Sequence, residues 1–490
     1  MRRKVGLIAY ADRFGGDLAG LHALLNGPLR GLFGGVHVLP FYRPYDGSDA
    51  GFDPQDHTEV DARLGTWDDI AALSGQYRVM ADMIVNHVSS GSPQFRDWLA
   101  NGDASEFAGM FLTYGTAFPD GATEEMLLRL YRPRPGLPFT PYRLGTGQKA
   151  LVWTTFTPQQ VDLDVRHPAT RAYLLRILDR LAAAGVAHVR LDAVGYAVKT
   201  PGLTSFLTPE TFKFIGEVTA WCHERHLEVL VEVHSHFLHQ VEIARQVDYV
   251  YDFALPPLIL HALTATDAEP LLTWQGLRPA NAVTVLDTHD GIGVIDVGPD
   301  ATDRALPGLL SPDQISRLVG TIHDNSGGTS REATGTAASN VDLYQVNCTF
   351  YDALGRDDGR YLLARALQFW TPGIPQVYYA GLLAGGNDMD LLARTHVGRD
   401  VNRHHYTPGE IEAALARPVV QALCRLIRFR NTHPAFEGSL TCSGSATTIE
   451  MSRARDGDEA VLRADLADGS AEVTWTENGT RNSAPLAALP

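Results

Sequence analysis

The sequence has few cysteines, no long apolar segment and no excess of positive charge. Its four cysteines, Cys222, Cys348, Cys424 and Cys442, lie far apart and form no Cys-x-x-Cys pair. This spacing argues against a zinc knuckle or a disulfide framework and favours a reducing compartment. No apolar run approaches the length that spans a membrane. The apolar stretch at residues 5–10 is too short for a signal peptide, so we expect a cytoplasmic protein.

The charge balance is acidic. The chain has 41 Lys and Arg against 57 Asp and Glu, a net charge of −16. Such a surface repels nucleic acid and anionic lipid, so neither is an expected partner. An anionic substrate would have to meet a local basic pocket. The 490 residues, of which 44% are hydrophobic, suit one large soluble catalytic domain with appendages.

Strand-like apolar runs alternate with helix-like stretches along the chain. Several runs are nearly continuous in Val, Ile and Leu, as expected for strands buried on both faces. Helices are predicted at 168–184, between Pro168 and Gly185, and at 208–226, which opens with Thr-Pro-Glu. The alternation predicts an α/β fold, a (β/α)8 TIM barrel with its active site at the C-terminal ends of the strands. The eight predicted strands are 5–10, 36–40, 77–85, 186–192, 227–233, 247–253, 281–287 and 376–379.

Two segments are too long to be loops of the barrel. Residues 88–167 contain Gly, Pro and aromatic residues with little periodicity, and 292–357 are rich in Gly, Ser, Thr and Asn. We interpret them as subdomains inserted after strand 3 and strand 7. Short alternating runs after about residue 436 predict a small all-β domain. The predicted boundaries are therefore 1–87, 168–291 and 358–435 for the barrel, 88–167 and 292–357 for the inserted subdomains, and 436–490 for the C-terminal β domain.

Three acidic residues, Asp192, Glu232 and Asp290, come at or just after the ends of predicted strands 4, 5 and 7. A carboxylate at the end of an apolar strand is costly without a partner, and Arg190 and His289 are placed to be such partners. One such acid is most simply explained as the anchor of a loop. Three of them at the catalytic end of one barrel predict a catalytic site instead.

Four short motifs carry a family resemblance. They are Asp-Met-Ile-Val-Asn-His at 82–87, Arg-Leu-Asp at 190–192, Glu-Val-His at 232–234 and Thr-His-Asp at 288–290. In order and spacing they resemble the four sequence regions typical of the α-amylase superfamily, glycoside hydrolase family 13. The resemblance covers nearly the whole chain, including the insertion after strand 3 and the terminal β domain.

The resemblance implies a retaining mechanism with two displacements at one carbon. Asp192 is implied to be the nucleophile that forms a β-glucosyl ester, and Glu232 the general acid and then base. Asp290 is implied to hold sugar hydroxyls and to favour the oxocarbenium-like transition state. One acid must then stay protonated while its neighbour stays ionised, and Arg190 is the positive charge expected to keep Asp192 anionic.

Further stretches of the sequence, at 44–53, 131–140, 152–162, 286–293, 340–345 and 398–403, resemble the sucrose phosphorylases of this family more closely than the amylases. This resemblance implies reversible phosphorolysis of sucrose to α-D-glucose 1-phosphate and D-fructose. Asp49 and Arg399 are implied to clamp the glucosyl 4-hydroxyl and to close the pocket behind one sugar. Phe52 and Phe156 are candidates for stacking on sugar faces. The full set of implied sugar-binding residues is Asp49, Phe52, His87, Phe156, Arg190, Tyr196, His289, Gln345 and Arg399.

Phosphorolysis needs a positively charged binding site for phosphate near the accessible side of the nucleophile. Arg134, between two prolines that restrict the backbone, is the candidate for binding phosphate. The resemblance places Asp342, Leu343, Tyr344 and Gln345 on an opposing loop that shapes the acceptor site.

No cofactor is expected, because carboxylates and inorganic phosphate suffice for the chemistry. Many amylase relatives bind a structural calcium ion through the residue that corresponds to Asn86. We expect none here, since no loop is dense in oxygen ligands. Relatives can be homodimers, and no stretch of the sequence marks an interface.

Three alternatives stay open. One is a phosphorylase of a charged acceptor, sucrose 6-phosphate or glucosylglycerate, which the nearby His234, His236 and His239 favour. Another is an α-glucosidase or transglucosylase, which would release or transfer glucose without phosphate. The last is a barrel that only binds sugar or protein, against which all three carboxylates argue.

Overall fold

The computed structural model describes residues 4–47, 49–133, 136–300, 303, 305–336, 344–477 and 479–490. Within them, eight parallel strands close into a barrel in the order β1-β16-β13-β12-β11-β10-β5-β2. All eight coincide with predicted strands, so the (β/α)8 fold is confirmed. The strands are β1 (Gly6–Ala9), β2 (Gly35–Val38), β5 (Arg78–Ile84), β10 (His188–Asp192), β11 (Glu228–Val231), β12 (Tyr249–Asp252), β13 (Ala282–Thr284) and β16 (Ile374–Tyr378).

Helices surround the barrel because each buries one apolar stripe against it. In α6 (Pro168–Ala183) the stripe includes Leu174, Leu178 and Leu181, and the helix stops before Gly185, which has a φ of 74°. Helix α7 (Pro209–His223) ends three residues before the predicted end at 226, where His226 has a φ of 58°. A left-handed residue ends an α-helix. The other helices of the barrel are α1 (Leu18–Asn26), α2 (Trp67–Ser74), α8 (Phe237–Ile243), α9 (Leu255–Ala265), α10 (Glu269–Leu277), α14 (Asp358–Trp370), α15 (Tyr379–Leu382), α16 (Met389–Thr395), α17 (Pro408–Leu415) and α18 (Pro418–Thr432).

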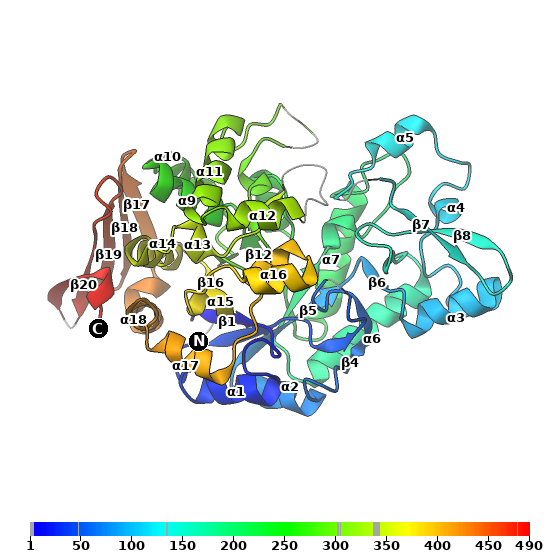
Figure 1. Cartoon of the computed structure of the whole chain (residues 1–490), viewed down its shortest axis with the longest axis horizontal. Helices are drawn as coiled ribbons and strands as arrows, with labels where there is room; N and C mark the ends of the chain where they lie inside the picture. Colours follow the sequence, from blue (N-terminus) through cyan, green and yellow to red (C-terminus); the bar gives the residue numbers. More distant parts are fainter. Residues whose placement is uncertain are drawn as a thin grey trace.

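The segment predicted as the first inserted subdomain projects to one side of the barrel (Figure 1). It has a small apolar cluster of its own around Phe118, Leu130 and Trp153. It contains β6 (His87–Ser89), α3 (Pro93–Asn101), α4 (Tyr114–Ala117), α5 (Glu124–Arg129), β7 (Phe139–Arg143), β8 (Lys149–Trp153) and β9 (Gln160–Asp162). Strand β6 pairs with β9, which returns the chain to the barrel beside His87. A shorter hairpin of β3 (Tyr42–Pro44) and β4 (Pro54–Val60) lies nearby.

The second predicted insertion follows β13. Its short strands β14 (Ile292–Gly293) and β15 (Gln345–Val346) pair antiparallel. Between and after them lie α11 (Pro312–Asn325), α12 (Thr329–Thr336) and α13 (Phe350–Ala353). The pairing brings the loop at 344–345 back to the end of β13.

The C-terminal end forms an antiparallel sheet of five strands, as predicted, at the side opposite to the first insertion (Figure 1). Its strands are β17 (Ser439–Gly444), β18 (Thr448–Arg455), β19 (Asp458–Asp465), β20 (Ala471–Glu477) and β21 (Thr480–Pro485). The indole of Trp370 in α14 donates to the Ala460 carbonyl at 3.0 Å, which ties the sheet to the barrel helices.

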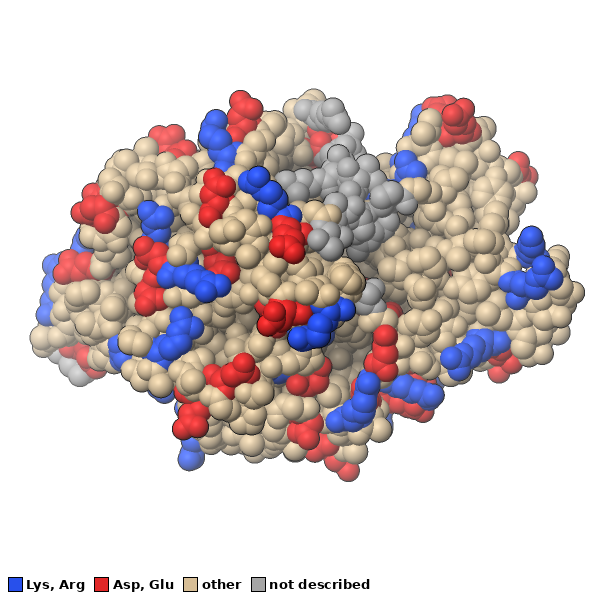
Figure 2. All heavy atoms as spheres, viewed as in Figure 1, with Lys and Arg blue, Asp and Glu red and all other residues tan. Residues whose placement is uncertain are grey.

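Acidic and basic side chains are interspersed over the face seen in Figure 2. Among the described residues, no helix combines the length and the apolar character needed to cross a membrane.

Candidate active site

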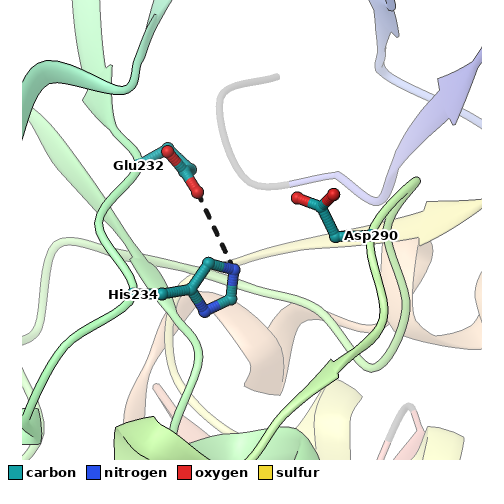
Figure 3. A group of neighbouring side chains, drawn as sticks. All are labelled: Glu232, His234 and Asp290. Carbon is teal, nitrogen blue, oxygen red and sulfur yellow. Dashed lines mark ion pairs between the residues drawn. The ribbon is translucent and has the colours of Figure 1, made fainter. Parts of the chain in front are cut away.

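The three acidic residues singled out in the sequence meet at the C-terminal end of the barrel. Asp192 is the last residue of β10, and Glu232 comes directly after β11. Single ligand atoms of Glu232, His234 and Asp290 all lie within 4.8 Å of one another. Figure 3 shows Glu232 and Asp290 directed into the same space from two different segments, Glu232 just after β11 and Asp290 in the loop between β13 and β14. Parallel strands deliver their carboxyl ends to one face, which is why residues far apart in sequence converge here.

Arg190 is the positive charge at the floor of this group, and its side chain is 2% exposed. Its Nη1 lies 2.6 Å from Asp82 Oδ1 and 2.8 Å from Asp192 Oδ1. Its Nη2 lies 3.9 Å from Glu232 Oε1. Asp82 is held on its other side by His37, at 2.9 Å. Asp82 therefore holds Arg190 in place, and the charge of Arg190 lies closer to Asp192 than to Glu232.

Opposing influences act on Asp192. Burial raises the pKa of Asp192 well above its usual range, Arg190 lowers it, and the carboxylates of Glu232 and Asp82 raise it again. The negative charges of the neighbouring carboxylates therefore oppose ionisation of Asp192, and the charge of Arg190 favours it. The 2.8 Å contact with Arg190 is the interaction that favours the anionic form of Asp192. Glu232 Oε2 accepts instead from the N–H of Ala193, at 3.4 Å.

Asp290 and Asp49 share one arginine. Arg399 places Nη1 2.5 Å from Asp290 Oδ1 and Nη2 2.6 Å from Asp49 Oδ1. Burial raises the pKa of Asp290, but His289, Arg399 and Arg403 outweigh it and hold that pKa well below its usual range. The pKa of Asp49 is also lowered, by Arg399 against the effect of burial. Both carboxylates stay ionised at neutral pH.

The two predicted hydroxyl-binding histidines are buried and neutral. Burial lowers the pKa of His289 to about 3 and also lowers that of His87. The His289 ring stacks on Phe52, with centroids 4.4 Å apart and planes 8° from parallel. His87 Nε2 lies 3.0 Å from the Phe52 carbonyl and 3.1 Å from Gln160 Nε2. One face of Phe52 is thus already covered by His289.

Aromatic rings from the first insertion and from the segment between β10 and α7 pack together on one side of the site. Phe156 contacts His87 edge to face at 5.4 Å between centroids and Tyr196 at 5.1 Å. Phe206 packs on Tyr196 at 4.6 Å. These rings form an apolar wall next to the carboxylates.

Tyr344 and Gln345 of the second insertion, which were predicted to shape the acceptor site, both lie beside His234. The ring of Tyr344 meets His234 edge to face, with centroids 5.3 Å apart. Burial raises the pKa of Tyr344 well above its usual value. Gln345 Oε1 accepts from the Gly291 N–H at 3.2 Å, and its Nε2 lies 3.3 Å from His234 Nε2. Arg134, Asp342 and Leu343, the other predicted acceptor residues, lie outside the described residues.

His234 is cationic. Burial lowers its pKa, but Asp296, at 2.8 Å, outweighs burial and raises the pKa of His234 to about 9. An imidazolium facing Gln345 Nε2 would oppose two donors. The Gly291 N–H, which donates to Gln345 Oε1, holds the amide in this orientation, so the 3.3 Å approach of Gln345 Nε2 to the cationic His234 is a contact between two donors.

Four contributors to this site were not predicted from the sequence. Asp82 and Gln160 lie within quoted motifs, but no role was inferred for them. Asp296 and Lys199 have no local signal at all. A carboxylate inside an apolar strand, as at Asp82, is the one pattern that could have indicated a buried ion pair.

The residues do not fit a metal ion. Glu232, His234 and Asp290 have metal-like spacing, but a protonated His234 has no lone pair to donate. Asn86, the calcium ligand of many amylase relatives, has its Oδ1 2.6 Å from the ammonium of Lys199. A cation of the chain itself therefore occupies that position.

The comparisons with known proteins agree with this class of site. The family model described as "Alpha amylase, catalytic domain" matches residues 9–251. A sucrose phosphorylase from Agrobacterium vitis is 56% identical, over 97% of both chains. One from Bifidobacterium adolescentis is 52% identical, over 100% of this chain and 96% of the relative. The crystal structure of sucrose 6F-phosphate phosphorylase from Thermoanaerobacter thermosaccharolyticum superposes with a TM-score of 0.90 at 36% identity, covering 99% of this chain and 98% of that one.

The barrel and its carboxylates thus define a member of the α-amylase superfamily. Within that superfamily, the chain belongs to the sucrose phosphorylase family.

Proposed function

We propose that this chain catalyses the reversible phosphorolysis of sucrose to α-D-glucose 1-phosphate and D-fructose. The observation that carries the proposal is the grouping of three acids: Arg190 lies 2.8 Å from Asp192 and 3.9 Å from Glu232, and Glu232 and Asp290 have ligand atoms within 4.8 Å of each other. The chain is also 56% and 52% identical to two sucrose phosphorylases. The enzyme is then a hexosyl transferase of the disaccharide phosphorylase type.

In the first displacement, a carboxylate oxygen of Asp192 attacks the anomeric carbon of the glucosyl unit. The bond from that carbon to the fructosyl oxygen breaks, and Glu232 delivers its proton to the leaving oxygen. The 2.8 Å contact with Arg190 supports the nucleophile role, because it favours the anion on Asp192. The product of this step is a β-glucosyl ester.

In the second displacement, a phosphate oxygen attacks the same carbon and the ester bond to Asp192 breaks. Glu232 accepts the proton of the incoming phosphate. Two inversions give net retention, so an α-glucoside gives α-glucose 1-phosphate. Asp290, held anionic by Arg399, is placed to stabilise positive charge on the sugar ring in both transition states.

Arg399 and Asp49 close the pocket behind a single glucosyl unit. Their 2.6 Å ion pair supports a pocket for a disaccharide rather than a groove for starch. We assign phosphate binding to Arg134, with Tyr344 and the Asp342–Leu343 loop shaping the acceptor side. The cationic His234 beside Tyr344 supports an anionic co-substrate there.

Two of the histidines that would favour a phosphorylated acceptor are already engaged. His236 Nε2 lies 3.1 Å from the Pro307 carbonyl. His239 Nδ1 lies 2.8 Å from Ser235 Oγ, and burial lowers the pKa of His239. These contacts support sucrose over sucrose 6-phosphate or glucosylglycerate as the preferred substrate.

We also propose that the enzyme works in the cytoplasm, needs no cofactor beyond phosphate as co-substrate, and forms a homodimer. All four cysteines are free, which supports a reducing compartment.

The deciding experiment incubates the purified protein with sucrose, with and without phosphate, and identifies the products. Glucose 1-phosphate and fructose, formed only with phosphate, are expected. Parallel assays with sucrose 6F-phosphate, glucosylglycerol and glucosylglycerate rank the acceptors by kcat/KM. Phosphate-independent release of glucose at the same rate would assign the chain to the hydrolases or transglucosylases instead.

A further inference from the structure

A buried ammonium group lies beside the glucosyl pocket without touching the carboxylates that we assign to catalysis. Lys199 Nζ lies 2.6 Å from Asn86 Oδ1 and 2.6 Å from Asp162 Oδ2, and it also donates to the Tyr196 carbonyl. The Lys199 side chain is 2% exposed and that of Asp162 is 0% exposed. Three acceptors match the three N–H donors of an ammonium group, so the cation is fully satisfied.

Two of these acceptors belong to segments that carry pocket residues. Asn86 directly precedes His87, whose ring contacts Gln160 at 3.1 Å. Tyr196 contributes both the carbonyl that accepts from Lys199 and the ring that meets Phe156. Lys199 therefore connects the chain after β5 with the chain after β10.

The third acceptor connects Lys199 to the inserted segment. Asp162 Oδ1 accepts from the N–H of Thr155 at 3.0 Å, and Asp162 Oδ2 accepts from the Thr155 hydroxyl at 2.5 Å. Thr155 directly precedes Phe156. Through Asp162, Lys199 thus fixes the backbone at Thr155, next to Phe156.

The positive charge of Lys199 is neutralised by a carboxylate in direct contact with it, that of Asp162. An ammonium in an apolar interior is costly alone, and a buried carboxylate is costly alone. The ion pair of Lys199 with Asp162 offsets part of these costs, although burial still lowers the pKa of Lys199. The Trp153 ring lies 5.7 Å from Nζ, within the range of a cation–π contact. The group satisfies itself without solvent or a metal ion.

We propose that Lys199 is a positioning residue of the glucosyl pocket, whose ammonium group holds the segments of His87, Phe156 and Tyr196 together. The kinetic part of this inference rests on the proposed function. The structural part concerns the fold alone and can be tested without any substrate.

The first test separates positioning from stability. Lys199→Met keeps the volume but leaves Asp162 as an unpaired buried charge, so its melting temperature should fall. The double variant Lys199→Met with Asp162→Asn removes both charges and should regain most of the lost stability. Its kcat/KM for sucrose should nevertheless stay roughly 100-fold below wild type, because a misplaced pocket is not repaired by removing a charge. Lys213→Met, at an exposed lysine, is the matched control.

The second test supplies the missing ammonium group as a small molecule in solution, with no covalent link to the chain. Lys199→Ala removes the three outer methylenes and Nζ, which together correspond to n-propylammonium. Added n-propylammonium should raise the kcat/KM of this variant and its melting temperature. The same concentration of 1-propanol, which has the same shape but no charge, should do neither, and sodium chloride controls for ionic strength.

The donor side alone should respond. The kcat/KM values for sucrose and for α-glucosyl fluoride should fall together in the double variant, while the KM for phosphate stays near that of wild type. Near-wild-type kcat/KM in a folded double variant would overturn the inference, as would rescue by 1-propanol equal to that by n-propylammonium. If wild type itself formed no glucose 1-phosphate, the proposed function would fail, whereas the melting temperatures would still decide the structural part.

Discussion

The guanidinium of Arg399 lies 2.6 Å from the carboxylate of Asp49, across 350 positions of sequence. Its other nitrogen lies 2.5 Å from Asp290. The planar guanidinium of Arg399 thus joins Asp49, at the back of the proposed sugar pocket, to Asp290, a carboxylate that we assign to catalysis. A lysine could not bridge both oxygens in this way, because its ammonium is a point charge.

Arg399→Ala should lower kcat/KM for sucrose by more than 100-fold. The change leaves Asp49 and Asp290 without their shared partner, and loss of one member of a buried charge pair costs about 3 kcal/mol or more, where 1.36 kcal/mol corresponds to tenfold in rate. Arg399→Lys should recover part of the loss. Steady-state kinetics of both variants, with Arg43→Ala at an exposed position as control, measure this. Equal activity of the Lys variant and wild type would contradict a bidentate role.

Asp192→Ala should abolish glucosyl transfer while the protein stays folded. Loss of a nucleophile costs on the order of 10⁴-fold or more in kcat. The fold should survive because Arg190 keeps its 2.6 Å contact with Asp82. Product formation and thermal unfolding of the same preparation give the two readouts. Turnover near wild type in a folded variant would end the assignment of Asp192 as nucleophile.

Glu232→Gln should slow the reaction of donors whose leaving group needs a proton much more than the reaction of donors whose leaving group does not. Sucrose needs a proton on its leaving oxygen, and the amide cannot supply one. Fluoride leaves without protonation, so α-glucosyl fluoride should still release fluoride rapidly. The measurement compares initial fluoride release with fructose release for the variant and wild type. Equal losses on both donors would argue against an acid role for Glu232.

The sequence predicted the architecture well because its signals are local. Each barrel strand is a short apolar run, and each of Asp192, Glu232 and Asp290 is marked by its place relative to a strand end. The contacts of Lys199 with Asn86 and Asp162 join segments up to 113 positions apart, and no local periodicity encodes such a pairing. The same holds for Gln160 with Asp49, at 111 positions.

The end of one helix also differs between the prediction and the structure. The predicted helix at 208–226 continues over three residues that the structure leaves out of α7 (Pro209–His223). His226 has a φ of 58°, and a non-glycine residue in the left-handed region gives no composition signal. The sequence therefore gives no local signal for the end of this helix.

Chelation should leave the enzyme unchanged. The Asn86 position is occupied by Lys199 Nζ at 2.6 Å, and His234 is held as a cation by Asp296 at 2.8 Å. We therefore expect the same kcat/KM and the same melting temperature in excess EDTA and in millimolar calcium chloride. A fall in melting temperature on chelation, reversed by calcium, would contradict this view of the two sites.

Asp53 should make the stability of the enzyme fall as the pH rises. Burial, and then the carboxylate of Asp49, raise the pKa of Asp53 from 3.8 to about 7, and its Oδ1 has no hydrogen-bond partner among the described residues. A pKa raised in the folded state contributes stability that is full below the unfolded pKa and is lost as the pH rises through the folded pKa. The window is therefore pH 4 to 7, and the loss is at most about 4 kcal/mol.

Asp53→Asn should remove this loss, because an amide stays neutral throughout. The variant and wild type should melt together near pH 4, and the variant should melt at a higher temperature at pH 8. Thermal unfolding across this range measures both, with the exposed Asp68→Asn as control. Parallel melting curves for Asp53→Asn and wild type from pH 4 to 8 would mean that Asp53 is already ionised in the folded enzyme. A larger gap at pH 4 than at pH 8 would reverse the sign of the linkage and contradict the assignment altogether.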